Sequence, residues 1–99
     1  MAFPELCVGL GLPEPVPEYQ FAKCIGRKWR MDWCWVREKV YLECDGGVWI
    51  QGRHTRGAGY IKDIEKHNEA AIMGYRRLTV VPQQMKSGEV FDILQRMFK

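Results

Sequence analysis

The sequence predicts one small α+β domain in which helices flank a mixed central sheet, over residues 1–99. Two observations support this class. Aromatic and polar residues alternate between 29 and 45, as in paired strands. Residues 60–73 then follow a helical period, and a β-rich run over 75–81 stops at Pro82. With a helix at each end, the expected order is α-β-β-β-α-β-α.

The first quarter of the chain is expected to hold a short helix and an edge strand. The helix covers residues 3–10, because Pro4 suits a first helical turn and glycines follow the last turn. Three prolines over 13–17 then enforce an extended connection. The edge strand covers 19–24 and ends before Gly26.

Residues 29–35 and 40–45 form the predicted central hairpin, joined by a short charged link. If Arg37 and Glu38 form its tip, paired positions sum to 75, and Asp32 lies opposite Glu43. Cross-strand partners on one face lie roughly 5 Å apart. Two carboxylates at that distance repel each other, and a divalent metal between them would remove the repulsion.

A third carboxylate extends this pattern, because Glu43 and Asp45 point to the same face of an ideal strand. Oxygen ligands of this kind suit Mg²⁺ or Mn²⁺. Such an ion can polarise a phosphate and generate hydroxide from water. The residues alone leave open a plainer interpretation, a solvated sheet face with an ion pair between Arg30 and Asp45.

A glycine-rich loop of about a dozen residues follows the hairpin, and loops of that length are usually functional or disordered. Its His54 can accept a proton from water near neutral pH, or can simply bond to Asp63 and order the turn. The other side chains that distinguish it from a linker are Trp49, Gln51, Arg53, Thr55 and Arg56.

The two C-terminal helices are predicted from their apolar spacing. In the helix over 60–73 the expected buried face comprises Ile61, Ile64, Asn68, Ala71 and Ile72, which leaves Lys66 and His67 on the solvated side. Asn68 would then bond from the helix to a loop. Ser87 is the expected cap of the last helix, whose predicted buried stripe is Val90, Phe91, Leu94, Met97 and Phe98.

The net charge of +3 is unevenly spread. One basic cluster holds Lys23, Arg27, Lys28 and Arg30, and a second holds Arg53, Arg56, Lys62 and Lys66. Basic clusters beside aromatic residues are typical of nucleic-acid binding, although a solvated basic rim has the same composition. Trp33 and Trp35 are expected in the core, whereas Trp49 is the best candidate to stack on DNA bases.

Four cysteines occur without a CxxC pair, and we expect buried reduced thiols in a cytoplasmic protein. No apolar run is long enough to span a membrane, so no membrane partner is expected. The first ten residues lack a basic region, so no signal peptide is expected either.

Order and motifs together resemble the PD-(D/E)XK nuclease superfamily, whose restriction-endonuclease-like core runs α-β-β-β-α-β. More closely, residues 18–78 resemble small phage and bacterial proteins related to the very-short-patch mismatch endonucleases. The resemblance covers about two thirds of the chain. The segments that carry it are EYQF at 18–21, RKWRMDW at 27–33 and LECDGGVWIQGRHTRGAGYIKDIEKHNEAAIMGYRRL at 42–78.

The resemblance implies site residues. Asp32 would be the metal-binding aspartate, Glu43 the second acidic ligand, and Cys44 would offer its backbone carbonyl to the metal. Position 45 departs from the superfamily, which usually has lysine there; the mismatch-repair branch also lacks it and uses histidines. The general base is therefore unassigned, with candidates Lys66, His54 and Gln51, while Glu5 is a candidate first-helix carboxylate.

The expected function is a Mg²⁺-dependent (or Mn²⁺-dependent) DNA endonuclease, nicking or structure-selective, in phage DNA processing or recombination. The resemblance implies products with 5′-phosphate and 3′-hydroxyl ends, and it leaves room for a homodimer. The location would be the cytoplasm of a bacterial host cell. Two alternatives remain open: a nucleic-acid-binding module without catalysis, and a phage protein whose acidic face binds a host partner.

Overall fold

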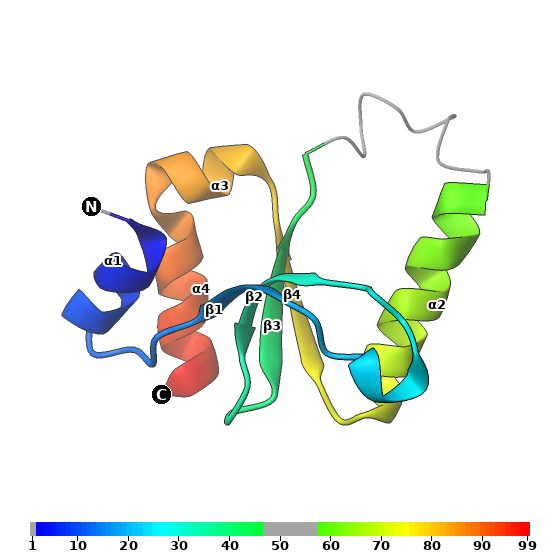
Figure 1. Cartoon of the computed structure of the whole chain (residues 1–99). Coiled ribbons are helices and arrows are strands. Elements are labelled where there is room, and N and C mark those ends of the chain that lie inside the picture. The colour runs from blue at the N-terminus through cyan, green and yellow to red at the C-terminus, as the bar shows by residue number, and fades with distance from the viewer. Residues whose placement is uncertain (1, 47–57) are drawn as a thin grey trace.

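The computed structural model describes residues 2–46 and 58–99. Within them, four strands form one mixed sheet with helices on both faces, which confirms the predicted α+β class (Figure 1). The elements are α1 (Phe3–Gly9), β1 (Val16–Tyr19), the 3₁₀ helix η1 (Lys23–Ile25), β2 (Met31–Trp35), β3 (Val40–Cys44), α2 (Ala58–Ile72), β4 (Arg76–Val80), α3 (Pro82–Ser87) and α4 (Glu89–Phe98).

The sheet has the order β1-β2-β3-β4, and only the last pair is parallel. Parallel neighbours need a crossover connection, and α2 lies within the one that joins β3 to β4. The β2–β3 hairpin pairs Trp33 with Leu42 and Trp35 with Val40. These pairs sum to 75, so the predicted register is confirmed.

The edge strand was predicted in the wrong place. It is β1, four residues that include Pro17, whereas part of the predicted segment forms η1. Pro17 cannot donate a ladder hydrogen bond, and a strand at the sheet edge tolerates this loss. The hairpin also begins later than predicted, at Met31. Trp29 instead stacks on Phe21, with ring centroids 6.3 Å apart.

One face of the sheet carries the larger apolar core, with α1, α3 and α4 on the same side in Figure 1. Trp35 is 1% exposed and donates from Nε1 to the carbonyl of Pro13 at 2.8 Å. Trp33 packs on Phe3, so both tryptophans lie in the core as predicted. The buried members of this cluster are Cys7, Leu12, Trp35, Val40, Leu42, Val80, Val90 and Leu94.

The opposite face is covered by α2, and the predicted buried side of this helix is wrong. The apolar stripe points to solvent: Ile61 is 60% exposed and Ile72 is 77% exposed. Lys66 and His67 instead face the sheet, where they contact Glu43 and Tyr41 of β3. Asn68 is exposed with the stripe, so its predicted role in a buried bond is wrong too.

The C-terminal region contains one more helix than predicted. Pro82 ends β4 but also begins α3, whose first turn is closed by the bond from the Val81 amide to Gln84 Oε1. In α4 the predicted stripe is confirmed at its centre, since Val90 and Leu94 are fully buried. The predicted cap is wrong by one residue: the N-cap of α4 is Gly88, and Ser87 ends α3, although its Oγ accepts the Glu89 amide at 3.2 Å.

All four cysteines are free thiols. Cys7 and Cys34 are buried as predicted, and Cys44 is half-buried. Cys24 is exposed in η1, so the prediction of burial is wrong for it. None of the helices in the described ranges is long and apolar enough to cross a membrane.

Candidate active site

Asp32 and Glu43 meet where the β2–β3 ladder ends. The paired residues run as far as Trp33 and Leu42. Beyond them, side-chain carboxylates accept the amide protons: the Asp32 amide donates to Glu43 Oε2 at 3.2 Å, and the Cys44 amide donates to Asp32 Oδ2 at 2.9 Å. Each carboxylate is therefore held by the backbone of the opposite strand, and the predicted pair is brought together.

Lys66 reaches this pair from α2. Its Nζ lies 3.2 and 3.3 Å from the two carboxylate oxygens of Glu43, and both side chains are only 13% exposed. Burial raises the pKa of Glu43, and Lys66 opposes this rise. A buried ion pair gains little net stability, because the loss of hydration offsets the attraction. The contact therefore adds little net stability, but it places the ammonium group of Lys66 beside the carboxylates.

Asp45 is not part of a three-carboxylate cluster in this structure. In residues 2–46 and 58–99 no group of three His, Cys, Asp or Glu side chains is close enough to hold one ion. Asp45 follows the end of β3, where its amide donates to the Val80 carbonyl at 2.8 Å. Metal binding by Asp45, or by the Cys44 carbonyl, stays a prediction.

The alternative ion pair between Arg30 and Asp45 is wrong. Arg30 bonds to Glu18 at 3.1 Å, on an exposed surface where both side chains are more than half accessible. Arg30 precedes β2, so the hairpin does not hold it opposite Asp45. Glu5 lies in α1, on the other side of the sheet from α2, and its Oε1 accepts the Ala2 amide at 3.0 Å (Figure 1). It caps its own helix there.

Five predicted site residues lie outside the described residues: Trp49, Gln51, Arg53, His54 and Arg56. Asp63, the expected partner of His54, lies instead 3.5 Å from His67 Nε2. Lys62 lies on α2 and is exposed. Of the three candidates for the missing lysine, Lys66 is thus the one whose place beside the carboxylates is described.

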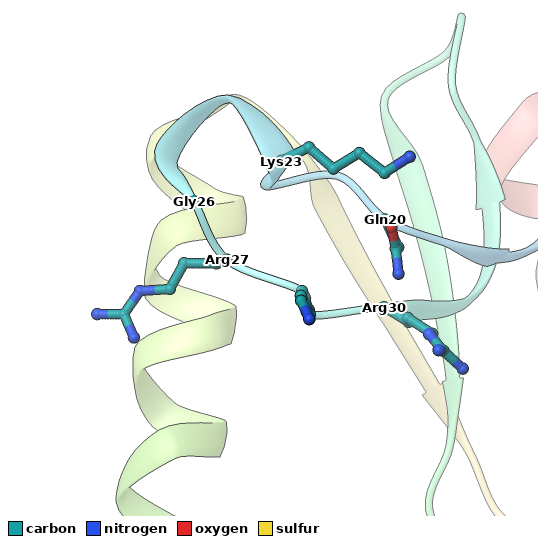
Figure 2. A pocket seen from close by; sticks show the side chains of 6 residues that line it. Gln20, Lys23, Gly26, Arg27 and Arg30 are labelled. Atoms are coloured by element: carbon teal, nitrogen blue, oxygen red, sulfur yellow. The ribbon is translucent and has the colours of Figure 1, made fainter.

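A concave basic surface lies on the segment that leads into β2. It has a volume of about 490 Å³ and is lined by Gln20, Lys23, Gly26, Arg27, Lys28 and Arg30. Figure 2 shows Lys23 extending toward Gln20, whereas Arg27 points away, and the Arg27 guanidinium lies 4.9 Å from the centre of the Trp29 ring. Arg30 precedes Asp32 by two residues, so the basic surface begins within about 7 Å of the site backbone. The four members of the first predicted basic cluster thus line one concavity, in which Arg27 points away and Arg30 pairs with Glu18.

Sequence reasoning missed a polar chain beside the site. Tyr41 Oη and His67 Nδ1 are 2.7 Å apart, and Tyr41 is 1% exposed. At 3.5 Å, the contact of His67 Nε2 with Asp63 is too long for a strong hydrogen bond. The strand period gave a usable signal, because Tyr41 shares its sheet face with Glu43.

No protein-family model, no curated protein and no solved structure matches this chain. The class defined by fold and site is thus a small α+β domain with two carboxylates and a lysine converging on one sheet face. Its resemblance to the PD-(D/E)XK superfamily stays a prediction.

Proposed function

We propose that the protein is a Mg²⁺-dependent (or Mn²⁺-dependent) DNA endonuclease of the PD-(D/E)XK type. The observation that supports this most is the convergence of three side chains. Asp32 and Glu43 are fixed side by side at the end of a hairpin, and Lys66 contacts Glu43 from the covering helix. Such a set is suited to phosphoryl chemistry, because the acidic pair can bind a metal ion and the ammonium group can offset negative charge on the phosphate.

The donor set fits a hard divalent ion. Carboxylate oxygens are its preferred ligands, and each carboxylate keeps lone pairs beyond the amide bond that orients it. Asp32 and Glu43 would hold the ion, which when bound supplies Lewis-acid polarisation of the phosphate and a more acidic water. The amides of Asp32 and Cys44 act as the outer supports that keep the two ligands in place.

Lys66 is our choice for the role of the lysine that is absent at position 45. Its ammonium group already lies against Glu43, so it is placed to neutralise a phosphate oxygen or to orient water. His54 stays a second candidate for proton transfer. Single alanine variants at the two positions separate them, because the residue in the acid–base role should lose far more rate than binding.

DNA would reach the site along the concave basic surface. Lys23, Arg27, Lys28 and Arg30 offer positive charge on the segment that leads into β2, and phosphate contacts of this kind give salt-dependent binding without reading sequence. A domain of 99 residues has little room for further specificity elements, so we propose nicking or structure-selective cleavage in phage DNA processing. The proposed location is the cytoplasm of the bacterial host.

The homodimer is also a proposal, and the outward face of α2 is where we place it. Ile61, Ile64, Asn68 and Ala71 follow heptad spacing, with three of them apolar. An asparagine at such a position pairs with its copy across a two-fold axis in parallel helix dimers. Sedimentation analysis of Ile64→Glu against wild type tests this: a wild-type protein that stays monomeric at high concentration contradicts the dimer.

The presence of Asp45 in place of a lysine supports a second candidate function, nucleic-acid binding without catalysis. Because the superfamily's usual lysine is absent there, a nucleic-acid-binding module without catalysis has the same fold and the same basic surface. Plasmid nicking with and without Mg²⁺ separates the two proposals. The third alternative, an acidic face for a host protein, is less well supported, because Glu43 is largely covered by Lys66.

The deciding experiment compares three proteins in a supercoiled-plasmid assay: wild type, Asp32→Asn and Asp92→Asn. Asp92 is an exposed aspartate on α4, so its variant is a matched control with the same chemical change away from the site. We expect Mg²⁺-dependent nicking by wild type and control only, and loss of the calorimetric Mg²⁺ signal in Asp32→Asn. Cleavage by Asp32→Asn at the wild-type rate would refute the metal site.

A further inference from the structure

The way α2 lies on the sheet is set by polar contacts together with the packing of one buried alanine. Ala70 is the one fully buried residue in the part of α2 whose side chains are described, and the apolar stripe of the helix faces solvent. Ala70 packs in an apolar cluster with Phe21, Ala22, Met31, Cys34 and Tyr41. The directed contacts to β3 and its turn are Lys66 with Glu43, His67 with Tyr41, and the Lys39 ammonium with the Met73 carbonyl at 3.1 Å.

The contact between Tyr41 and His67 is the shortest of these. Tyr41 Oη and His67 Nδ1 lie 2.7 Å apart, Tyr41 is 1% exposed, and the two rings stack with an interplanar angle of 10°. His67 Nε2 lies 3.5 Å from Asp63. The imidazole is thus held in one orientation between Tyr41 and Asp63.

The two pairs form a matched set. Tyr41 and Glu43 are two residues apart on the same face of β3, and their partners His67 and Lys66 are neighbours on α2. Neighbouring helical residues differ by about 100° in direction. A rotation of α2 about its axis that broke one contact would therefore carry the other side chain away from its partner.

We propose that His67 is a positioning residue, whose hydrogen bond with Tyr41 fixes the rotation of α2 and thereby places Lys66 on Glu43. The placement itself is a structural statement about the free protein. Its consequence for cleavage rests on the proposed nuclease function, through the role that we give to Lys66.

Lysine acylation tests the placement without any nuclease assay. Folded protein is treated with limiting acetic anhydride, and mass spectrometry gives the modification rate of Lys66 relative to exposed Lys62 on the same helix. We expect Lys66 to be the slower one in wild type. His67→Phe and Tyr41→Phe should each raise this ratio about fivefold, the effect of losing one ordinary hydrogen bond. The double variant should rise no further, because both changes remove the same bond.

Two further variants separate this bond from general loosening. Tyr75→Phe also removes a hydroxyl beside Tyr41, with ring centroids 6.3 Å apart, but this hydroxyl does not bond to His67 and should leave the ratio unchanged. His67→Asn restores a hydrogen-bonding amide near the place of Nδ1 and should recover most of the protection. Slow reaction of the buried Cys34 thiol reports that each variant is folded.

Unchanged protection of Lys66 in folded His67→Phe and Tyr41→Phe would overturn the proposal. A rise of the Lys66 ratio in Tyr75→Phe as large as in Tyr41→Phe would overturn it too. In the cleavage assay, His67→Phe should lower kcat while DNA binding in Ca²⁺ stays unchanged. Wild-type protein that does not cleave would contradict the proposed function, yet the labelling ratios would still decide the role of His67.

Discussion

The two faces of the sheet are built on different principles. The face toward α1 and α4 is apolar, with Leu42 fully buried in its centre. The face toward α2 carries Glu43, the next residue along the same strand, and its contacts to the helix are largely polar. A single strand thus serves stability through one residue and the proposed chemistry through the next. A small domain can separate the two tasks because side chains alternate across a strand.

The largest expected effect is on the site face. Glu43→Gln keeps the size of the side chain but removes the charge that would bind metal, so we expect Mg²⁺-dependent cleavage to be abolished. Its DNA binding in Ca²⁺ should remain, as filter binding can measure. Cleavage at the wild-type rate would show that the carboxylate pair is not the metal site.

The same variant sharpens the comparison through stability. Burial raises the pKa of Glu43, so the native state favours the protonated carboxyl. The protonated carboxyl therefore adds to the free energy of unfolding below the ordinary pKa of 4.5, and this addition is lost as pH rises through the native pKa. At pH 7 the buried charge therefore costs stability. We expect urea unfolding of Glu43→Gln at that pH to show a free energy of unfolding no lower than that of wild type.

Lys66→Ala should come second. It removes the ammonium group that contacts Glu43, and we expect the cleavage rate to fall by roughly 10²–10⁴-fold, the range for a lost acid–base group. Single-turnover kinetics at saturating protein measure this step separately from binding. A normal rate in Lys66→Ala together with a dead His54→Ala would move the role to His54.

Leu42→Ala tests the opposite face. Leu42 is fully buried, so the cavity should lower the free energy of unfolding by about 2–5 kcal/mol. Under conditions where the variant is folded, its cleavage rate should stay close to that of wild type. A large loss of rate with little loss of stability would mean that the two faces do not divide their tasks as we propose.

The basic surface should show a smaller, salt-dependent effect. Replacing Lys23 and Lys28 with glutamine removes two positive charges from the concave site and should reduce the log–log salt slope of DNA binding by about two. The matched control replaces Lys86 and Lys99, which belong to the C-terminal helical region on the other side of the sheet (Figure 1). Equal slopes in the two double variants would exclude this surface as the path of the DNA backbone.

The smallest expected effect is a loss of stability at low pH that depends on His67. Burial and the charges of Arg77 and Lys66 lower its pKa below the ordinary 6.5, while Asp63 opposes them and Tyr41 covers Nδ1. The unfolded chain then binds the extra proton, so stability is full above 6.5 and falls as pH drops through that value. Urea titrations between about pH 7.5 and pH 5.5 should show a steeper fall in wild type than in His67→Phe. Parallel curves would contradict the lowered pKa.

The sequence alone predicted the hairpin, its register once Arg37 and Glu38 are taken as the tip, and the last helix. Alternation over 29–45 and a short charged link fix the pairing, and this places Asp32 against Glu43 before any coordinates are known. The stripe of Val90 and Leu94 likewise predicts the buried face of α4, because apolar residues there meet an apolar sheet face.

Only the tertiary structure decided which side of α2 faces the sheet. Apolar spacing predicted that Ile61 and Ile72 would be buried and Lys66 solvated, and the reverse holds. The spacing of apolar residues describes one helix only, whereas the surface on which that helix packs is formed by other parts of the chain. Here that surface presents Tyr41 and Glu43, so hydrogen bonds and charge, together with the packing of Ala70, select the contacting side of the helix.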